Sequence, residues 1–219
     1  VTQILSAPRG SADWLIHHEL QYGGLVQDVP RRKVSPYDSR TKEQLRSGGM
    51  IGGDRFLHHG YGQTYAEELE RFCARPPHTV VEIGILRGTG LAVWCDLFPD
   101  ARVVGLDIDL THYRENIDNL LERGAFSRNR PEEYEFDQLA PDEAMLRDLF
   151  SGQGVDIVID DGLHSDPAIK ATFGAVRPYL VNDWLYIIED SLSAAELIAG
   201  IAPELSVRAD RELTVVAAT

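Results

Sequence analysis

Acidic side chains that follow two apolar runs are the part of this sequence best suited to chemistry. Asp161 follows the run that begins at Val155, and His164 lies three residues later. The next apolar run ends in Glu189 and Asp190. Carboxylates gathered in one place repel one another unless protons or a cation intervene. Oxygen ligands without a thiolate favour Mg2+ or a similar divalent ion, so we expect a metal site here.

His164 follows the first acidic pair in a turn that precedes Asp166 and Pro167. Histidine exchanges protons readily near neutral pH, so this residue could remove a proton from a hydroxyl. A loop histidine bonded to the backbone is the alternative. Strand alternation gives Asp160 the opposite direction from Asp161, and Asp160 is therefore expected only to hold the loop.

A glycine-rich turn joins an earlier apolar run to the helix after it. Glu82 and Gly84 end the run, and Gly88 precedes the predicted helix, so a ligand could approach bare backbone. Position 86 is Leu86, where the dinucleotide fingerprint requires glycine, which makes a nicotinamide enzyme a minority interpretation. Asp107 ends the next apolar run and could accept hydrogen bonds from both hydroxyls of a ribose. A purely structural turn remains the alternative.

Asp137 and Gln138 follow a third short run, at the edge of the sheet that Asp107 is expected to share. An amide and a carboxylate placed there could bind the edge of an adenine. An exposed loop pair without such a role explains the two residues equally well.

The elements that would position these side chains alternate between strand and helix. Alternation at this spacing predicts right-handed βαβ units and an α/β fold, with a mostly parallel sheet, helices on both faces and a C-terminal antiparallel hairpin. We expect a turn-rich arm or lid over residues 1–62 and one catalytic domain over 63–219. The expected strands are 79–83, 102–106, 134–136, 155–160, 184–188, 205–208 and 213–217, and the expected helices begin at 64, 90, 112, 141 and 167.

The bulk composition excludes several classes of partner. The 35 acidic against 21 basic residues give a formal charge of −14, which repels a nucleic acid backbone. No apolar run approaches the ~20 residues that cross a bilayer, so no membrane partner is expected. Cys73 and Cys95 lack metal-binding spacing and are interpreted as reduced, buried thiols. Together these features predict a soluble, cytoplasmic protein.

Taken together, the motifs resemble the macrocin O-methyltransferase and cephalosporin-hydroxylase-like branch of S-adenosylmethionine (SAM)-dependent methyltransferases. The resemblance spans roughly residues 54 to 190, and its parts are matched in order and spacing. They are Asp54-Arg55, His59-Gly60-Tyr61-Gly62-Gln63-Thr64-Tyr65, Glu82-Ile83-Gly84 through Gly90 with Trp94, Asp137-Gln138, Asp160-Asp161-Gly162-Leu163-His164 and Glu189-Asp190. The chain departs from the family pattern at Arg55 and Leu163, where lysine and serine are common, and this bears on substrate contacts.

The resemblance implies a class I, Rossmann-like methyltransferase that uses SAM and Mg2+ to methylate a sugar hydroxyl in antibiotic biosynthesis. It implies a small-molecule acceptor with vicinal hydroxyls, a deoxysugar, and a homo-oligomeric assembly. His164 would be the general base, acting beside Asp161, and the metal ligands would be Asp161, Glu189 and Asp190. The implied cofactor contacts are Glu82, Gly84, Gly88, Asp107, Asp137 and Gln138, with His59 and Tyr61 near the cofactor or acceptor pocket.

Two further interpretations stay open at this point. A catechol-type O-methyltransferase shares the same sheet and a similar acidic cluster but methylates an aromatic diol. A non-catalytic subunit could bind SAM without performing the transfer. The intact set of Asp161, His164, Glu189 and Asp190 favours an enzyme.

Overall fold

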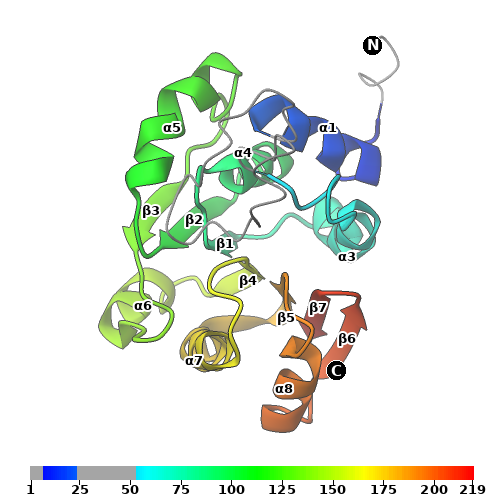
Figure 1. Cartoon of the computed structure of the whole chain (residues 1–219), viewed down its shortest axis with the longest axis vertical. Coiled ribbons are helices and arrows are strands. Elements are labelled where there is room, and N and C mark those ends of the chain that lie inside the picture. The colour runs from blue at the N-terminus through cyan, green and yellow to red at the C-terminus, as the bar shows by residue number, and fades with distance from the viewer. Residues whose placement is uncertain (1–6, 24–52) are drawn as a thin grey trace, which may run out of the picture. The chain divides into compact units, whose positions relative to one another are not determined.

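The computed structural model describes residues 7–23 and 53–219 (Figure 1). The chain divides into two compact units. The first unit takes in the described part of residues 1–76 together with Leu86–Pro99 and Thr111–Arg130. The second comprises Pro77–Ile85, Asp100–Leu110 and Pro131–Thr219. Much of the predicted arm lies outside the described residues, and its division from the catalytic domain at residue 62 stays a prediction.

The second unit is built on a seven-stranded sheet in the order β3-β2-β1-β4-β5-β7-β6. Strands β1 to β5 run parallel, and β7 is antiparallel to both β5 and β6. The order reverses between β1 and β4, and this switch point is where open α/β sheets bind ligands. The predicted fold class is thereby confirmed. The strands are β1 (Thr79–Ile83), β2 (Arg102–Asp107), β3 (Glu132–Glu135), β4 (Val155–Asp160), β5 (Leu180–Ile188), β6 (Ser206–Asp210) and β7 (Leu213–Ala217).

Both faces of the central strands are buried, since every residue of β1 and of β4 is buried. One face carries alternate residues such as Val81 and Val158 and packs against α6 (Glu143–Phe150), α7 (Asp166–Val176) and α8 (Ala194–Ile201). Burial of one such aliphatic or aromatic side chain stabilises a fold by about 1.5–3 kcal/mol. The apolar runs that identified the strands therefore also build the core that holds their ends in place.

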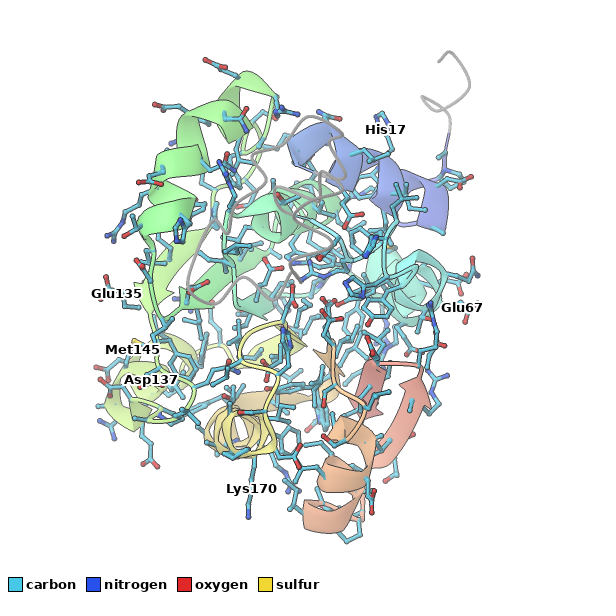
Figure 2. All side chains as sticks on the ribbon, viewed as in Figure 1. His17, Glu67, Glu135, Asp137, Met145 and Lys170 are labelled. Carbon is cyan, nitrogen blue, oxygen red and sulfur yellow. The ribbon has the colours of Figure 1, made fainter. Side chains whose placement is uncertain are left out.

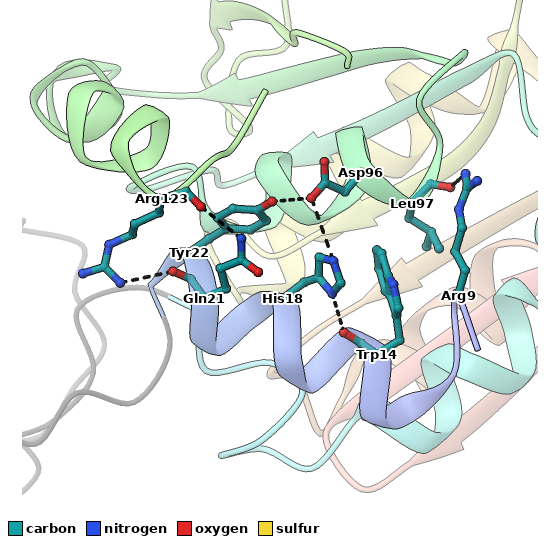
Figure 3. A network of polar contacts seen from close by, with 8 residues as sticks. All are labelled: Arg9, Trp14, His18, Gln21, Tyr22, Asp96, Leu97 and Arg123. Atoms are coloured by element: carbon teal, nitrogen blue, oxygen red, sulfur yellow. Dashed lines mark hydrogen bonds and ion pairs between the residues drawn. The ribbon is translucent and has the colours of Figure 1, made fainter. Parts of the chain in front are cut away.

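The first unit is helical in its described part, with α1 (Ala12–Tyr22), α3 (Gly62–Ala74), α4 (Thr89–Leu97) and α5 (Thr111–Glu122). Helix α1 packs against α3 and α4. The Tyr22 hydroxyl donates to the Asp96 carboxylate on α4, and Nδ1 of His18 lies 2.8 Å from the Trp14 carbonyl oxygen (Figure 3). Burial, followed by the hydrogen bond to Asp96, raises the pKa of Tyr22. This polar network anchors α1 to α4.

Helices α1 and α8 were not predicted. On α1 the buried face consists of Leu15, Glu19 and Tyr22, so a carboxylate interrupts the apolar stripe that would identify a helix. Helix α7 begins at Asp166, one residue before the predicted start at 167, and Ser165 is its N-cap. Strand β3 starts and ends earlier than expected, and β5 starts four residues earlier, at Leu180. Cys95 is buried as expected, but Cys73 is exposed.

Within residues 7–23 and 53–219, none of the helices has the length and apolar composition that a membrane span requires.

Candidate active site

The ends of three neighbouring strands lie level at one edge of the sheet. The register pairs Ile83 of β1 with Asp160 of β4, and Asp160 with Ile188 of β5. The parallel hydrogen bonding continues past the strands, because the Asp161 amide donates to the Ile83 carbonyl at 2.8 Å and the Glu189 amide donates to the Asp160 carbonyl at 2.9 Å. The two acidic segments predicted from sequence therefore end side by side.

Asp161, His164 and Asp190 form a group that could hold a metal ion. One ligand atom from each lies within 4.8 Å of the others, and Nε2 of His164 is 4.0 Å from Oδ1 of Asp161. All three side chains are half-buried. Two carboxylates and one imidazole suit a divalent cation that keeps further positions for water or a substrate oxygen.

Glu189, the third predicted ligand, is placed differently. Its residue is only 2% exposed, and its carboxylate is not a member of this group among the described residues. Asp190 follows it with a φ of 53°, in the left-handed region. A non-glycine residue held there stores strain of about 1–3 kcal/mol, and such residues cluster at functional sites. The Ser191 amide, which donates to the Glu212 carbonyl at 2.9 Å, fixes the turn just beyond it.

The orientation of His164 is set by the backbone of Glu189. Nδ1 of the imidazole lies 3.2 Å from the Glu189 carbonyl oxygen. A carbonyl can only accept a hydrogen bond, so the contact places the proton on Nδ1 and leaves Nε2 able to accept one. Nε2 is also the nitrogen that lies toward Asp161. The ring therefore turns its proton-accepting atom toward Asp161, and an acceptor atom of this kind is what a general base needs.

Asp160, adjacent to Asp161, belongs to a buried polar network. Its Oδ1 accepts from Nε2 of Gln138 at 2.7 Å, and its Oδ2 accepts from the Tyr186 hydroxyl at 3.1 Å. Burial raises the pKa of Asp160 to about 6, although both hydrogen bonds lower it. Burial also raises the pKa of Tyr186. Asp160 thus lies beneath the loop, as strand alternation predicted.

Gln138, predicted as an adenine contact, is 7% exposed, and its amide bonds within the protein. Nε2 donates to Asp160 and, at 3.2 Å, to Oγ1 of Thr172, while Oε1 accepts from the Leu163 amide. These contacts make Gln138 a brace between the loop and α7. The adenine contact stays a prediction.

The glycine turn is divided between the two units. In the second unit, a Cβ on Gly84 would lie 2.1 Å from the Asp161 carbonyl oxygen, and its φ is +82°, so only glycine fits there. Glu82, two residues before it, is 2% exposed. In the first unit, Gly88 has a φ of +78°, and a Cβ would lie 2.4 Å from the Tyr113 ring. The need for glycine at Gly88 is therefore already explained by packing within its own unit.

Asp107 is the last residue of β2, Asp137 lies two residues after β3, and both are at least partly accessible to solvent. Asp107 is half-buried and accepts from the Asp109 amide at 3.1 Å. Asp137 is exposed and accepts from the Leu139 amide at 2.8 Å, on the loop that leads into α6 (Figure 2). Each carboxylate therefore forms a short turn with its own loop, which fixes its direction.

His59 and Tyr61 lie in the first unit, at the start of α3. Nε2 of His59 is 3.5 Å from Oδ2 of Asp54, and the two rings of His59 and Tyr61 stack with their centroids 5.3 Å apart. Tyr61 is buried and is the N-cap residue of α3. The segment that contains the motif is thus ordered, while its contact with cofactor or acceptor stays a prediction.

Glu19 is a buried acidic residue that the sequence did not lead us to predict. Its carboxylate, 2% exposed, accepts from the backbone amides of Phe56 and Leu57, each at 2.9 Å. Burial raises the pKa of Glu19 to about 7, although these bonds and the charge of Arg55 lower it. Glu19 therefore ties α1 to the segment that carries His59. A carboxylate on the apolar face of an amphipathic stretch was the available signal.

The sequence of this chain is similar to that of named O-methyltransferases, although no family model matches it. The 8-demethyl-8-alpha-L-rhamnosyl tetracenomycin-C 2'-O-methyltransferase of Streptomyces olivaceus is 32% identical over 148 residues, 64% of this chain and 35% of that protein. The mycinamicin VI 2''-O-methyltransferase of Micromonospora griseorubida is 31% identical over 52% of this chain and 27% of that protein. The predicted resemblance is confirmed, but the chain spans only about a third of these curated relatives or less.

Solved structures of methyltransferases have a similar fold. The MycE methyltransferase from the mycinamycin biosynthetic pathway, solved in complex with Mg and S-adenosylhomocysteine (SAH), has a TM-score of 0.56 at 22% identity. That match covers 74% of this chain and 50% of MycE. The SAH-bound Podospora anserina methyltransferase PaMTH1 has a TM-score of 0.54 at 13% identity and covers 97% of this chain and 89% of that one. At these identities the likeness concerns the fold alone.

Proposed function

We propose that this chain is a SAM-dependent, divalent-metal-dependent O-methyltransferase that acts on a sugar hydroxyl, in a glycosylated natural product or a nucleotide sugar. The observation that carries the proposal is the convergence of Asp161, His164 and Asp190 at the sheet edge where Gly84 meets Asp161. This edge lies at the reversal of the strand order, where sheets of this kind bind their ligands.

The donor set fits a divalent cation. Asp161 and Asp190 would hold it, and the resemblance adds Glu189 as a third ligand. When bound, Mg2+ supplies positive charge that lowers the pKa of a hydroxyl beside it. The protein's own side chains contribute the removal of the proton. Nε2 of His164 can accept it while Nδ1 stays bonded to the Glu189 carbonyl.

The second unit also fits a SAM molecule at this edge. Gly84 packs the turn after β1 against Asp161, and the carboxylates of Glu82 and Asp107, near the ends of neighbouring strands, are acceptors for hydroxyl or amino groups. SAM supplies the reactive methyl group, and the protein supplies position. Holding the acceptor oxygen and the methyl group close together can contribute ~7–11 kcal/mol to the rate. Cofactor roles for Gly88, His59, Tyr61, Asp137 and Gln138 are proposed from the resemblance.

The names of the relatives support a sugar-bearing acceptor. The Streptomyces olivaceus protein is named for a rhamnosyl compound, and a Streptomyces antibioticus relative, 28% identical over 52% of this chain, for an olivosyl compound. We propose an acceptor with vicinal hydroxyls on a deoxysugar. We also propose that residues 1–62 act as an arm or lid and that the chain forms a homo-oligomer.

The function is tested by methyl transfer from radiolabelled SAM to three groups of acceptors: nucleotide sugars, glycosylated macrolides or polyketides, and catechols. The full chain is assayed with Mg2+ and with EDTA. We expect label on a sugar oxygen only with Mg2+. Label on a catechol would replace the proposed acceptor with an aromatic diol. SAM binding without transfer to any acceptor would point to a non-catalytic subunit.

A further inference from the structure

The side-chain amide of Gln138 joins three parts of the second unit. Nε2 donates to Oδ1 of Asp160 at 2.7 Å and to Oγ1 of Thr172 on α7 at 3.2 Å. Oε1 accepts from the Leu163 amide at 2.5 Å. Both hydrogens of the amide are used, and their two acceptors fix which way its oxygen points.

The loop that Gln138 contacts is the one between Asp160 and His164. Gln138 bonds the residue before Asp161 and the residue before His164, so it fixes both ends of the segment. The middle of the loop is equally close, since a Cβ on Gly162 would lie 2.1 Å from Oε1 of Gln138. A side chain that is 7% exposed and makes these contacts leaves the loop little freedom to shift.

We propose that Gln138 is a positioning residue, whose amide holds the 160–164 loop so that Asp161 meets Asp190 at a divalent cation and His164 lies beside them. This inference rests on the proposed metal site and assigns Gln138 a part in it that is distinct from adenine recognition. Residues that orient metal ligands without touching the metal matter to binding, and their loss typically weakens metal affinity by about 10–100-fold. Replacing Gln138 by leucine keeps a side chain of similar size but removes the hydrogen bonds that Gln138 makes to the loop.

The test measures Mn2+ binding to the full chain without SAM or acceptor, from the electron paramagnetic resonance signal of free Mn2+. Mn2+ is used because it accepts the same oxygen-rich sites as Mg2+. The set comprises wild type, Gln138→Leu, Asp161→Asn and the control Gln63→Leu. Gln63 is exposed on α3, and its side-chain amide donates to Glu67 of the same helix. Thermal unfolding is recorded for each variant.

We expect Gln138→Leu to raise the Kd for Mn2+ by about tenfold or more, Asp161→Asn to abolish binding, and Gln63→Leu to change nothing. Excess Mn2+ should restore much of the turnover of Gln138→Leu, which a general folding defect would not allow. If folded Gln138→Leu binds Mn2+ with the wild-type Kd while Asp161→Asn does not bind it, the positioning role of Gln138 is wrong and the metal site stands. Wild-type protein that binds no Mn2+ overturns the metal site and this inference together.

Thr172→Val provides a second variant in case leucine at position 138 prevents folding. Thr172 is fully buried on α7. In this network its hydroxyl is bonded to Gln138, and Gln138 in turn is bonded to the loop. Valine has the same shape but cannot accept the amide hydrogen. A weaker Mn2+ affinity than in wild type, at an unchanged α-helical content, supports the proposal. Wild-type affinity in Thr172→Val, together with a failure of metal excess to rescue Gln138→Leu, contradicts it.

Discussion

Gly84 and Asp161 are in such close contact that a Cβ on the glycine would lie 2.1 Å from the aspartate carbonyl oxygen. The contact joins the turn after β1 to the first residue after β4. One residue belongs to the expected binding site of the methyl donor, and the other to the expected metal site. A change at either position is therefore transmitted directly to its neighbour.

Gly84→Ala should destabilise the second unit and weaken SAM binding. The φ of +82° disfavours alanine by about 1–3 kcal/mol, and the added methyl group must push the Asp161 backbone aside. Urea unfolding and calorimetric titration with SAH measure both effects. Gly174→Ala, within α7, is the matched control, because a Cβ added there would meet none of the described neighbouring residues within 4 Å. The control should be neutral or slightly stabilising. Equal stability of the two variants would contradict the argument.

His164→Ala should lower kcat by about 10²–10⁴-fold while leaving the affinity for SAH unchanged. The expectation follows from Nε2, which is left as the proton acceptor by the contact of Nδ1 with the Glu189 carbonyl. Turnover and SAH titration are measured on the same preparation. His112→Ala, on α5, serves as the control and should retain full activity. Full activity in His164→Ala removes the assignment of this residue as the base.

Metal removal should stop turnover reversibly. EDTA is expected to abolish methyl transfer, and added Mg2+ should restore it, because Asp161 and Asp190 would hold the ion beside His164. Asp190→Asn should need a much higher Mg2+ concentration for half-maximal rate. Asp148→Asn, exposed on α6, should behave as wild type. Undiminished rates in chelator would refute the metal role, whatever the variants do.

Glu19 should make the first unit less stable as the pH rises. Its folded pKa of about 7 lies above the ordinary value of 4.5, so the folded state binds the additional proton between these values. The free energy of unfolding therefore falls from pH 5 to pH 8, by on the order of 3 kcal/mol from this group. The neighbouring charges of Arg55 and Asp54 act on the same carboxyl.

The measurement compares urea unfolding of wild type and Glu19→Gln across that pH range. Glutamine still accepts one amide hydrogen bond but cannot ionise, so the difference between the two proteins should shrink or reverse as the pH rises. Glu196→Gln, exposed on α8, should preserve the wild-type pH profile. Parallel profiles for wild type and Glu19→Gln would show that Glu19 does not titrate in this range.

Much of the second unit could be predicted because its signals are local. The runs that became β1 and β4 are buried along their whole length and mostly β-branched and apolar, with Glu82, Asp156 and Asp160 as their acidic residues, and their bounds were predicted correctly. Parallel strands also bring their carboxyl ends to one edge, which is why Asp161 and Asp190 could be expected to meet.

The parts that could not be predicted depend on contacts between distant residues. Helix α1 was missed because Glu19 lies on its buried face, and the partners that satisfy this carboxylate are the amides of Phe56 and Leu57. Gln138 was expected to face a ligand, and its bond to Thr172 could not be inferred from either residue alone. The left-handed backbone conformation of Asp190 could not be predicted from the residues around it.

The placement of β7 has a consequence for synthesis of the chain. Residues 213–217 insert beside β5, the strand that leads into Glu189 and Asp190, although β5 is completed some 25 residues earlier. Until β7 has left the ribosome, β5 has an unpaired apolar edge, which is a template for pairing with another nascent chain. Translational pauses between these two strands should therefore favour aggregation over correct folding.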